Sequence, residues 1–310
     1  MFIHYLLIRL LTALAVVFGV AVLVFVLIHL VPGDPVDVML GESVQPADKE
    51  ALRHALGLDQ PLYQQLLNYV GRLFQLDFGH SIYSKRPILD IILERLPATI
   101  ELGSAALVVA MVIAFPLGVL AALYRNTLID VGAMGFALLG VSIPNFWMGP
   151  ILIMVGALWV GWFPVSGREG WLSLILPAMT LGTAMAAIVS RMVRSTLLEV
   201  INEDFMRTAR AKGLSEVWVI LRHGLRNALL PVITLLGLQL GTLLGGAVIT
   251  ETIFSWPGIG QLTVEAIQRR DYPMVQATIF IISLSYIIVN VMTDILYAWL
   301  DPRIRIQESS

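Results

Sequence analysis

The chain has 310 residues, of which 57% are hydrophobic and only 14% are charged. Soluble domains carry about a quarter of charged residues, so this composition is typical of an integral membrane protein. The net charge of -2 argues against a nucleic-acid-binding protein, which needs a clear basic excess. The absence of cysteine excludes disulfides and thiolate metal sites.

The first predicted element is an apolar helix over Leu10–Val31, long enough to cross a bilayer. Its apolar run is longer than that of a typical signal peptide, and no A-x-A cleavage pattern follows it. We therefore expect residues 1–31 to hold an uncleaved membrane helix.

Residues 32–99 predict a small helical segment on the outer side of the membrane. Prolines, which fit the first turn of a helix, stand at the starts of its predicted helices. A glycine, which fits the end of a helix, follows the first of them. The three predicted helices cover Pro46–Leu56, Leu62–Leu76 and Pro87–Leu96. On the third, Asp90 and Glu94 lie one turn apart, and we interpret them as a solvated face because no base or metal ligand accompanies them.

Residues 100–300 predict the membrane core, followed by a tail over 301–310. Together with the first helix, the apolar runs give six membrane helices in an all-α fold. The five spans of the core are Leu102–Leu123, Val131–Val160, Leu172–Val189, Leu229–Ile249 and Val275–Leu300. The long run over 131–160 is interrupted by Ser142, Pro144 and Asn145, which predicts a kink or a tilt.

The distribution of basic residues predicts the orientation of these spans. Short loops on the cytoplasmic side of a membrane are rich in arginine and lysine. Most basic residues of this chain fall on the inner side if the N-terminus is inside. We therefore expect a multi-pass protein with both termini in the cytoplasm.

The loop over residues 192–228 is the most informative segment, because it is polar yet regularly patterned. Apolar positions from Leu197 to Ala209 recur at near-helical spacing and predict an amphipathic helix at the inner membrane face. Gly213 is suited to end that helix in a left-handed conformation, and Ser215 is suited to cap the next. This pattern indicates a docking surface for a soluble partner. The alternative is a basic loop that rests on anionic lipid.

Several polar or small residues within the spans are candidates for helix packing or for the transport pathway. Small residues recur at Gly237, Gly241 and Gly245, which favours close helix packing, and Gln239 lies on the same helix. Polar groups are costly in lipid, so we include Asn145, Asn290 and Asp294 as intramembrane candidates. For Asp294 we expect a structural ion pair with an arginine.

Four charged residues fall in the predicted outer loop after the fifth span. They could gate or receive a solute, but solvated charges are the interpretation that we favour. These residues are Glu251, Arg269, Arg270 and Asp271.

The inner loop resembles that of the permeases of binding-protein-dependent ABC transporters. In the general E-A-A-x-x-x-G motif of these permeases, the glycine corresponds to Gly213, whereas Arg207 stands where the motif has glutamate. The dipeptide, oligopeptide, nickel and glutathione subfamily is more similar, because it shares T-A-R-A-K-G-L-S at Thr208–Ser215 and R-N-A-L-L-P at Arg226–Pro231. Further similar stretches are Pro32–Pro35, Leu56–Tyr63, Leu76–Gly79, Ser142–Trp147, Phe254–Gly260, Arg270–Pro273 and Leu300–Arg303.

The resemblance implies a type I ABC importer permease, the first of a related pair, that forms half of a translocation pathway. It implies three kinds of protein partner: a second homologous permease, two cytoplasmic ABC ATPases and an extracytoplasmic solute-binding protein. ATP and Mg²⁺ would be bound by the ATPases, and this chain would hold no cofactor and no catalytic residue. The residues implied to contact an ATPase are Arg207, Thr208, Ala209, Arg210, Ala211, Lys212, Gly213, Leu214 and Ser215.

The resemblance also implies the substrate class and the membrane. We expect peptides to be imported across a bacterial-type inner membrane, with nickel chelates or glutathione as alternatives. A secondary transporter is the rival of another class, but the two related halves with broken helices that such transporters often have are not evident. An enzyme is disfavoured because neither H-E-x-x-H nor G-x-S-x-G occurs.

Overall fold

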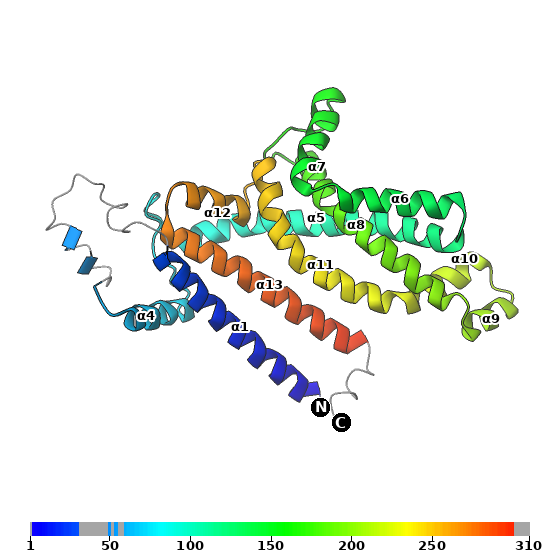
Figure 1. The fold of residues 1–310 in the computed structure, drawn as a ribbon, viewed down its shortest axis with the longest axis horizontal. Coiled ribbons are helices and arrows are strands. Elements are labelled where there is room, and N and C mark those ends of the chain that lie inside the picture. The colour runs from blue at the N-terminus through cyan, green and yellow to red at the C-terminus, as the bar shows by residue number, and fades with distance from the viewer. Residues whose placement is uncertain (1, 31–48, 51–52, 55–58, 301–310) are drawn as a thin grey trace.

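The structure is a computed structural model that describes residues 2–30, 49–50, 53–54 and 59–300 (Figure 1). The elements whose bounds lie within these residues are all helical. They are α1 (Phe2–Leu30), α4 (Leu62–Phe74), α5 (Ile88–Leu123), α6 (Leu128–Ser142), α7 (Asn145–Leu152), η1 (Ile153–Trp159), α8 (Leu172–Val200), α9 (Asp204–Ala211), α10 (Glu216–Trp218), η2 (Val219–Gly224), α11 (Leu225–Ile253), α12 (Ile259–Gln268) and α13 (Tyr272–Leu300). Both η elements are π-helical turns that continue an α-helix.

Within the described residues, five helices are long and apolar enough to cross a membrane, and a bent pair supplies a sixth. The six predicted spans fall on α1, α5, the pair of α6 with α7–η1, α8, α11 and α13. The predicted all-α architecture with six spans is confirmed.

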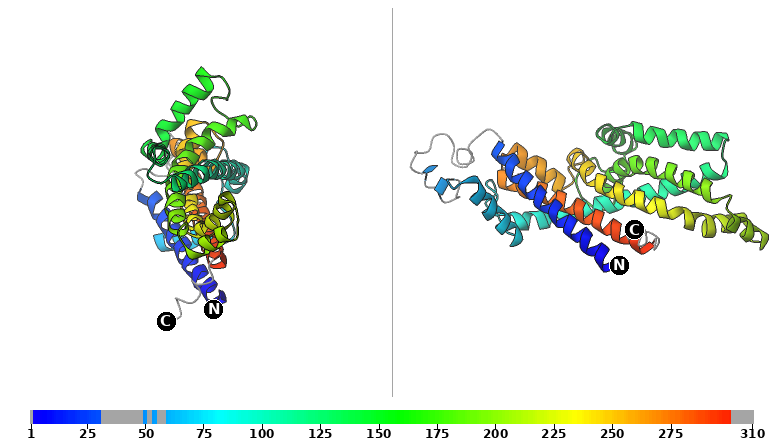
Figure 2. Two further views of the ribbon diagram at one scale, coloured as in Figure 1. Left: turned by 90° about the vertical axis from the view of Figure 1, so that its right-hand side faces the viewer. Right: turned by 60° about the horizontal axis from the view of Figure 1, so that its bottom comes forward.

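The third span is broken, which is more than the predicted kink. α6 and the α7–η1 segment meet at an angle of 104°. Ile143 has an extended backbone (φ -90°, ψ 114°) because the ring of Pro144 disfavours a helical conformation in the residue before it. Pro144 is itself extended and precedes the first turn of α7. The α7–η1 segment therefore projects from the body of the molecule (Figures 1 and 2).

The predicted separate helix over Pro87–Leu96 is wrong, because α5 runs through Pro97 as one helix from Ile88 to Leu123. The boundary that we placed at residue 99 thus lies inside a helix. Burial explains why the proline does not end it: Ile92 and Ala98, on either side of Pro97, are almost fully buried. Tertiary packing compensates for the missing N–H group.

Close packing of α5 against α8 forms the centre of the molecule. A Cβ atom on Gly118 of α5 would lie 2.7 Å from the carbonyl oxygen of Ser190, and one on Gly182 of α8 would lie 2.7 Å from that of Ala106. The core around this pair is rich in alanine, including Ala110. Small residues bring the two backbones together, as is usual where helices associate in lipid.

α1 and α13 lie side by side at the edge of the bundle (Figures 1 and 2). The short helix α4 leans on the C-terminal end of α1, where Nε2 of His29 is 3.3 Å from Oε1 of Gln65. α4 confirms the second predicted helix of the outer segment. The first, Pro46–Leu56, lies mostly outside the described residues.

Candidate functional site

The inner loop is built as a short helix packed under the ends of the spans. α9 buries Met206 and Ala209 against Val219, with Ile201 packed beside them. We predicted one helix from Thr196 to this point, but the extended backbone of Glu203 (φ -65°, ψ 152°) separates α8 from α9. The loop is therefore a folded unit with a small apolar core of its own.

The turn after α9 has the left-handed geometry that the sequence predicts. Gly213 has φ +79°, and its N–H donates to the carbonyl of Arg210 at 2.9 Å. Ser215 occupies the N-cap position of α10, although its side chain makes no capping hydrogen bond. α10, η2 and α11 then continue without a gap, so the second predicted helix of the loop is the N-terminal extension of the fifth span.

A charged bridge spans the turn. The guanidinium of Arg210 donates to both carboxylate oxygens of Glu216, with Nη2–Oε1 at 2.8 Å and Nε–Oε2 at 3.0 Å. Its Nη1 also reaches the carbonyl of Ile201 at 3.4 Å. The hydrogen bond with Glu216 raises the pKa of Arg210 above its usual value, so this arginine stays charged. The bridge joins α9 to α10 across Gly213.

The remaining predicted loop residues form the exposed face of this unit. Arg207 has 72% of its side chain exposed, and Asp204, 3.5 Å away, has 97%. Thr208 is exposed and donates to the carbonyl of Asp204, while Ala211 and Lys212 are also exposed. Apolar side chains lie exposed on the neighbouring turns at Phe205, Leu214, Val217, Trp218 and Leu221. A surface that exposes cationic and apolar side chains together is suited to contact with another protein.

The glycines of α11 divide into two groups. A Cβ atom on Gly237 would clash with Thr293 of α13, and one on Gly241 would come within 2.6 Å of Tyr286. Helix packing is therefore confirmed for these two. Gly245 is exposed with no atom near its Cβ direction, and Gln239 is partly buried.

The polar candidates of the spans lie in separate places. Asp294 pairs with Arg9 of α1 at 3.2 Å, which confirms the predicted structural ion pair. Asn290 is partly buried one turn earlier on α13. Asn145 opens α7, and its amide nitrogen would lie 3.3 Å from a Cβ atom on Gly246 of α11. These side chains do not form one site.

Two charges that we interpreted as solvated are in fact buried. Glu251 is fully buried, and its carboxylate accepts hydrogen bonds from the hydroxyl of Thr99 at 2.7 Å and the backbone N–H of Gln261 at 3.0 Å. Asp271, 3% exposed, accepts hydrogen bonds from the hydroxyl of Ser81 at 2.5 Å and from nearby backbone N–H groups. The interpretation holds for Arg269 and Arg270, which are exposed.

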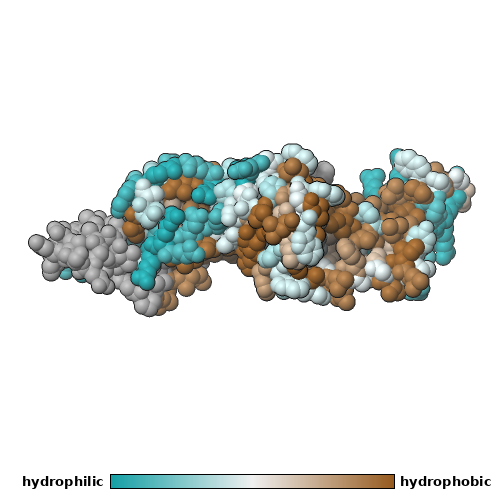
Figure 3. Space-filling view, turned by 90° about the horizontal axis from the view of Figure 1, so that it is seen from above, coloured by the Kyte–Doolittle hydropathy of each residue, from teal (hydrophilic) through white to brown (hydrophobic). Residues whose placement is uncertain are grey.

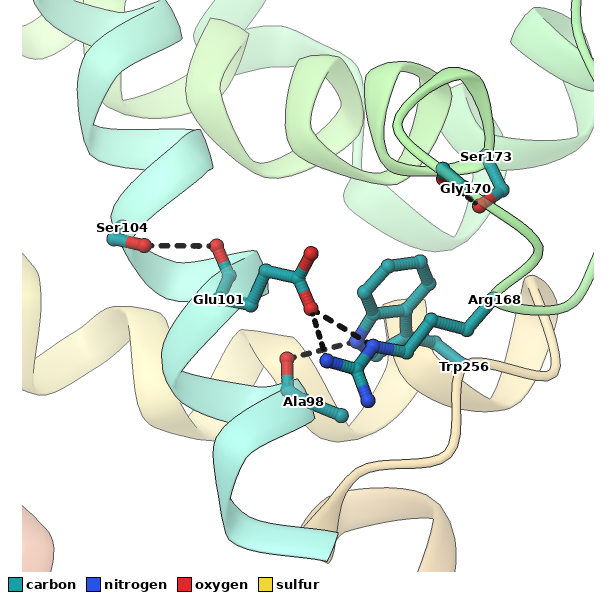
Figure 4. A network of polar contacts seen from close by, with 7 residues as sticks. All are labelled: Ala98, Glu101, Ser104, Arg168, Gly170, Ser173 and Trp256. Carbon is teal, nitrogen blue, oxygen red and sulfur yellow. Dashed lines mark hydrogen bonds and ion pairs between the residues drawn. The ribbon is translucent and has the colours of Figure 1, made fainter.

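A third polar cluster, which sequence reasoning missed, fixes the loop before α8 (Figure 4). Arg168 donates from Nε to Glu101 of α5 at 2.8 Å, and its guanidinium lies 5.8 Å from the ring centre of Trp256. The indole N–H of Trp256 donates to the carbonyl of Ala98 at 2.8 Å. These contacts join α5, the loop before α8 and the segment between α11 and α12.

The ion pair between Asp130 of α6 and Arg194 of α8 was also missed. Arg194 donates from Nε and Nη2 to the two carboxylate oxygens, at 2.6 and 2.7 Å. Asp130 is 5% exposed, and it also accepts from the N–H of Asn126. In the sequence, only the opposite charges at the start of one predicted span and just beyond the end of another could have suggested this pair.

Comparison with known proteins shows the family. The family described as "Binding-protein-dependent transport system inner membrane component" matches residues 114–306, and its N-terminal companion matches residues 2–103. The glutathione transport system permease protein GsiC of Escherichia coli strain K12 is 44% identical over 302 residues, covering 97% of this chain and 99% of GsiC. GsiC of Shigella dysenteriae serotype 1 shows the same identity and coverage.

Solved structures support the fold. A chain of the inward-facing MetNI methionine ABC transporter superposes with a TM-score of 0.59 at 18% identity, covering 68% of this chain and 96% of that one. A chain of an amino acid ABC transporter solved with histidines gives 0.51 at 14% identity. These matches show the type I ABC importer permease fold. The chain belongs to the family of inner membrane components of binding-protein-dependent transport systems, and is an ABC importer permease.

Proposed function

We propose that this permease forms half of a pathway that imports short peptides, with glutathione, itself a modified tripeptide, among them. The substrate class is supported by the relatives named as glutathione transport system permeases. It is also supported by the resemblance of Thr208–Ser215 and Arg226–Pro231 to the peptide and glutathione subfamily. A nickel chelate is the alternative substrate.

The proposed complex contains a second, homologous permease, two cytoplasmic ATPases that bind ATP and Mg²⁺, and an outer solute-binding protein. The inner loop is the proposed docking site for an ATPase. The observation that carries this assignment is the braced turn at Gly213: a left-handed glycine, a bidentate Arg210–Glu216 bridge and a buried Met206 hold an exposed polar face in place. A docking helix needs such support to transmit displacement to the spans.

The orientation follows from the same assignment. If the inner loop meets a cytoplasmic ATPase, then α11 runs outward from it and α13 runs back, so the end of α13 is cytoplasmic. The start of α1 is then cytoplasmic as well, because Arg9 and Asp294 join the two helices near those ends. The turn regions around α4 and α12 then face outward. This agrees with the excess of basic residues in the loops on the inner side.

The test is uptake by the reconstituted complex. Proteoliposomes containing both permeases and both ATPases, supplied with the binding protein, should accumulate labelled glutathione or short peptides only when ATP is hydrolysed. A complex that takes up only a nickel chelate would overturn the substrate assignment. Uptake that persists with a hydrolysis-deficient ATPase would overturn the ATP-driven mechanism and favour a secondary transporter.

A further inference from the structure

A small cavity opens on the proposed outer side, between the turn around residues 81–86, the first turns of α5 and the helix α12. Its volume is about 170 Å³. Sites for small-molecule ligands are larger, roughly 300–1,000 Å³, so this one is too small for a peptide substrate. A cavity of about 150 Å³ holds a molecule the size of benzene. One amino-acid side chain therefore fits.

Most charges around the cavity have partners within the chain. Arg86 forms a bidentate pair with Glu94, and Arg269 lies over the ring of Tyr83 and reaches Glu265 at 4.0 Å. The carboxylate of Asp271, which also lines the cavity, is saturated by the hydrogen bonds described above.

Arg95 is the exception. It lines the cavity and is partly buried, yet it makes no hydrogen bond or ion pair with any residue in the described part of the chain. Its charge acts on the neighbouring Glu94 and on the buried Glu251 without direct contact. A guanidinium, which carries five N–H donors, therefore belongs to the lining of a space the size of one side chain.

The surroundings favour a protein carboxylate as the occupant. Figure 3 shows hydrophilic side chains gathered on the end of the molecule that carries α12, so this face meets water rather than lipid. A guanidinium without a partner is complementary to a carboxylate, with which it forms two parallel hydrogen bonds. The partner that the proposed function brings to this face is the solute-binding protein.

We propose that the cavity receives the carboxylate side chain of an aspartate or glutamate on the solute-binding protein, with Arg95 as its counter-ion. This inference rests on the proposed function. It adds a single anchoring contact that sets how the donor protein sits over the permease. Electrostatic complementarity of this kind fixes orientation and accelerates encounter.

The test is binding of the purified solute-binding protein to the assembled transporter in nanodiscs, followed by biolayer interferometry. Arg95→Glu should weaken binding on the order of tenfold, as loss of one partner of an interfacial charge pair does. Raising the salt concentration should weaken binding of the wild type and have less effect on the variant. Arg72→Glu, an exposed arginine of α4 outside the cavity lining, is the matched control and should bind as the wild type does.

Ser84→Trp is a second variant, because it fills the cavity without changing any charge, and it too should weaken binding. Wild-type affinity for both variants would overturn the inference while leaving the proposed function intact. Loss of the second permease from the complex, with binding of the donor unchanged, would also overturn it. A wild-type transporter that binds no solute-binding protein would contradict the proposed function itself.

Discussion

The hydroxyl of Thr99 donates a hydrogen bond of 2.7 Å to the carboxylate of Glu251, although 152 positions separate the two residues. The same hydroxyl accepts a hydrogen bond of 2.9 Å from the N–H of Ile259. One buried side chain on α5 thus holds both the end of α11 and the start of α12. A buried carboxylate is stable only when its hydrogen bonds are made, so this pair fixes the junction of α5, α11 and α12.

Thr99→Val should lower the stability of the protein. The valine leaves the N–H of Ile259 without a partner and removes one hydrogen bond from Glu251, at a cost of about 1–3 kcal/mol. Thermal unfolding of the purified chain in detergent, followed by tryptophan fluorescence, measures the change. Thr252→Val is the control, because that exposed hydroxyl donates only to the carbonyl of Val248 in its own helix. Equal unfolding temperatures for the two variants would contradict the assigned role of Thr99.

Gly213→Val should uncouple ATP hydrolysis from uptake. No atom lies within 4 Å of the Cβ direction at Gly213, so the effect comes from its φ of +79° alone. A side chain in this left-handed region costs roughly 1–2 kcal/mol, and a β-branched one more. Uptake and ATP hydrolysis are measured together in proteoliposomes. Gly213→Asn should retain coupling because asparagine tolerates this conformation, and normal coupling in the valine variant would show that the turn is not needed.

Arg210→Glu should reduce co-purification of the ATPases by loosening the turn rather than by removing a docking charge. Arg210 and Glu216 are about half exposed, so their pair contributes at most about 1 kcal/mol to stability. The exchanged double variant Arg210→Glu, Glu216→Arg should restore the bridge and the co-purification. Failure of this rescue would assign Arg210 directly to the partner surface.

Lys212→Glu should weaken co-purification of the ATPases with no change in thermal stability. Lys212 is exposed and makes no ion pair within the described residues, so it is available to a partner. If the variant instead loses only its affinity for vesicles of anionic lipid, while the complex stays intact, the loop rests on the membrane. Vesicle flotation beside affinity purification separates the two results.

Gly237→Leu should destabilise the contact between α11 and α13, because even a Cβ atom at this position would clash with Thr293. We expect a loss of several kcal/mol, or failure to fold, as overpacking costs about 1–3 kcal/mol even where neighbours can adjust. Gly245→Leu is the matched control, since that position of the same helix is open. Expression and thermal unfolding of the two variants provide the comparison. A Gly245 variant that folds but loses transport would place this glycine at the interface with the second permease.

The sequence was sufficient for features that depend on neighbouring residues. The lengths of the apolar runs located the spans, and the glycine that follows the helical pattern, Gly213, predicted the left-handed turn. Both features follow from local preferences of the backbone and from the preference of apolar side chains for lipid. The separation of α8 from α9 was missed because Leu197 and Ile201 continue the helical spacing of apolar residues up to the break. The periodicity of apolar residues shows that a segment is helical, but it does not show where one helix ends and the next begins.

Features that depend on distant residues were not predictable in this way. Glu251 follows an apolar run and therefore suggested a solvated loop, since nothing near it in sequence indicates the hydroxyl of Thr99. Asp271 is balanced by the turn that contains Ser81, and α5 passes through Pro97 only because other helices bury its neighbours. In each case tertiary packing overrides the local preference.

α8 runs without a break from Leu172 to Val200, 29 residues, which is about 43 Å of helix at 1.5 Å per residue. Its C-terminal end leads through three residues into α9, and it packs closely against α5 at Gly118 and Gly182. We therefore expect the two helices to move together as one rigid lever. A displacement of α9 by one helical turn, about 5.4 Å, would tilt a lever of this length by about 7°. A rigid response of the spans to movement of α9 would thus depend on two glycines that lie in the helix packing and outside the loop itself.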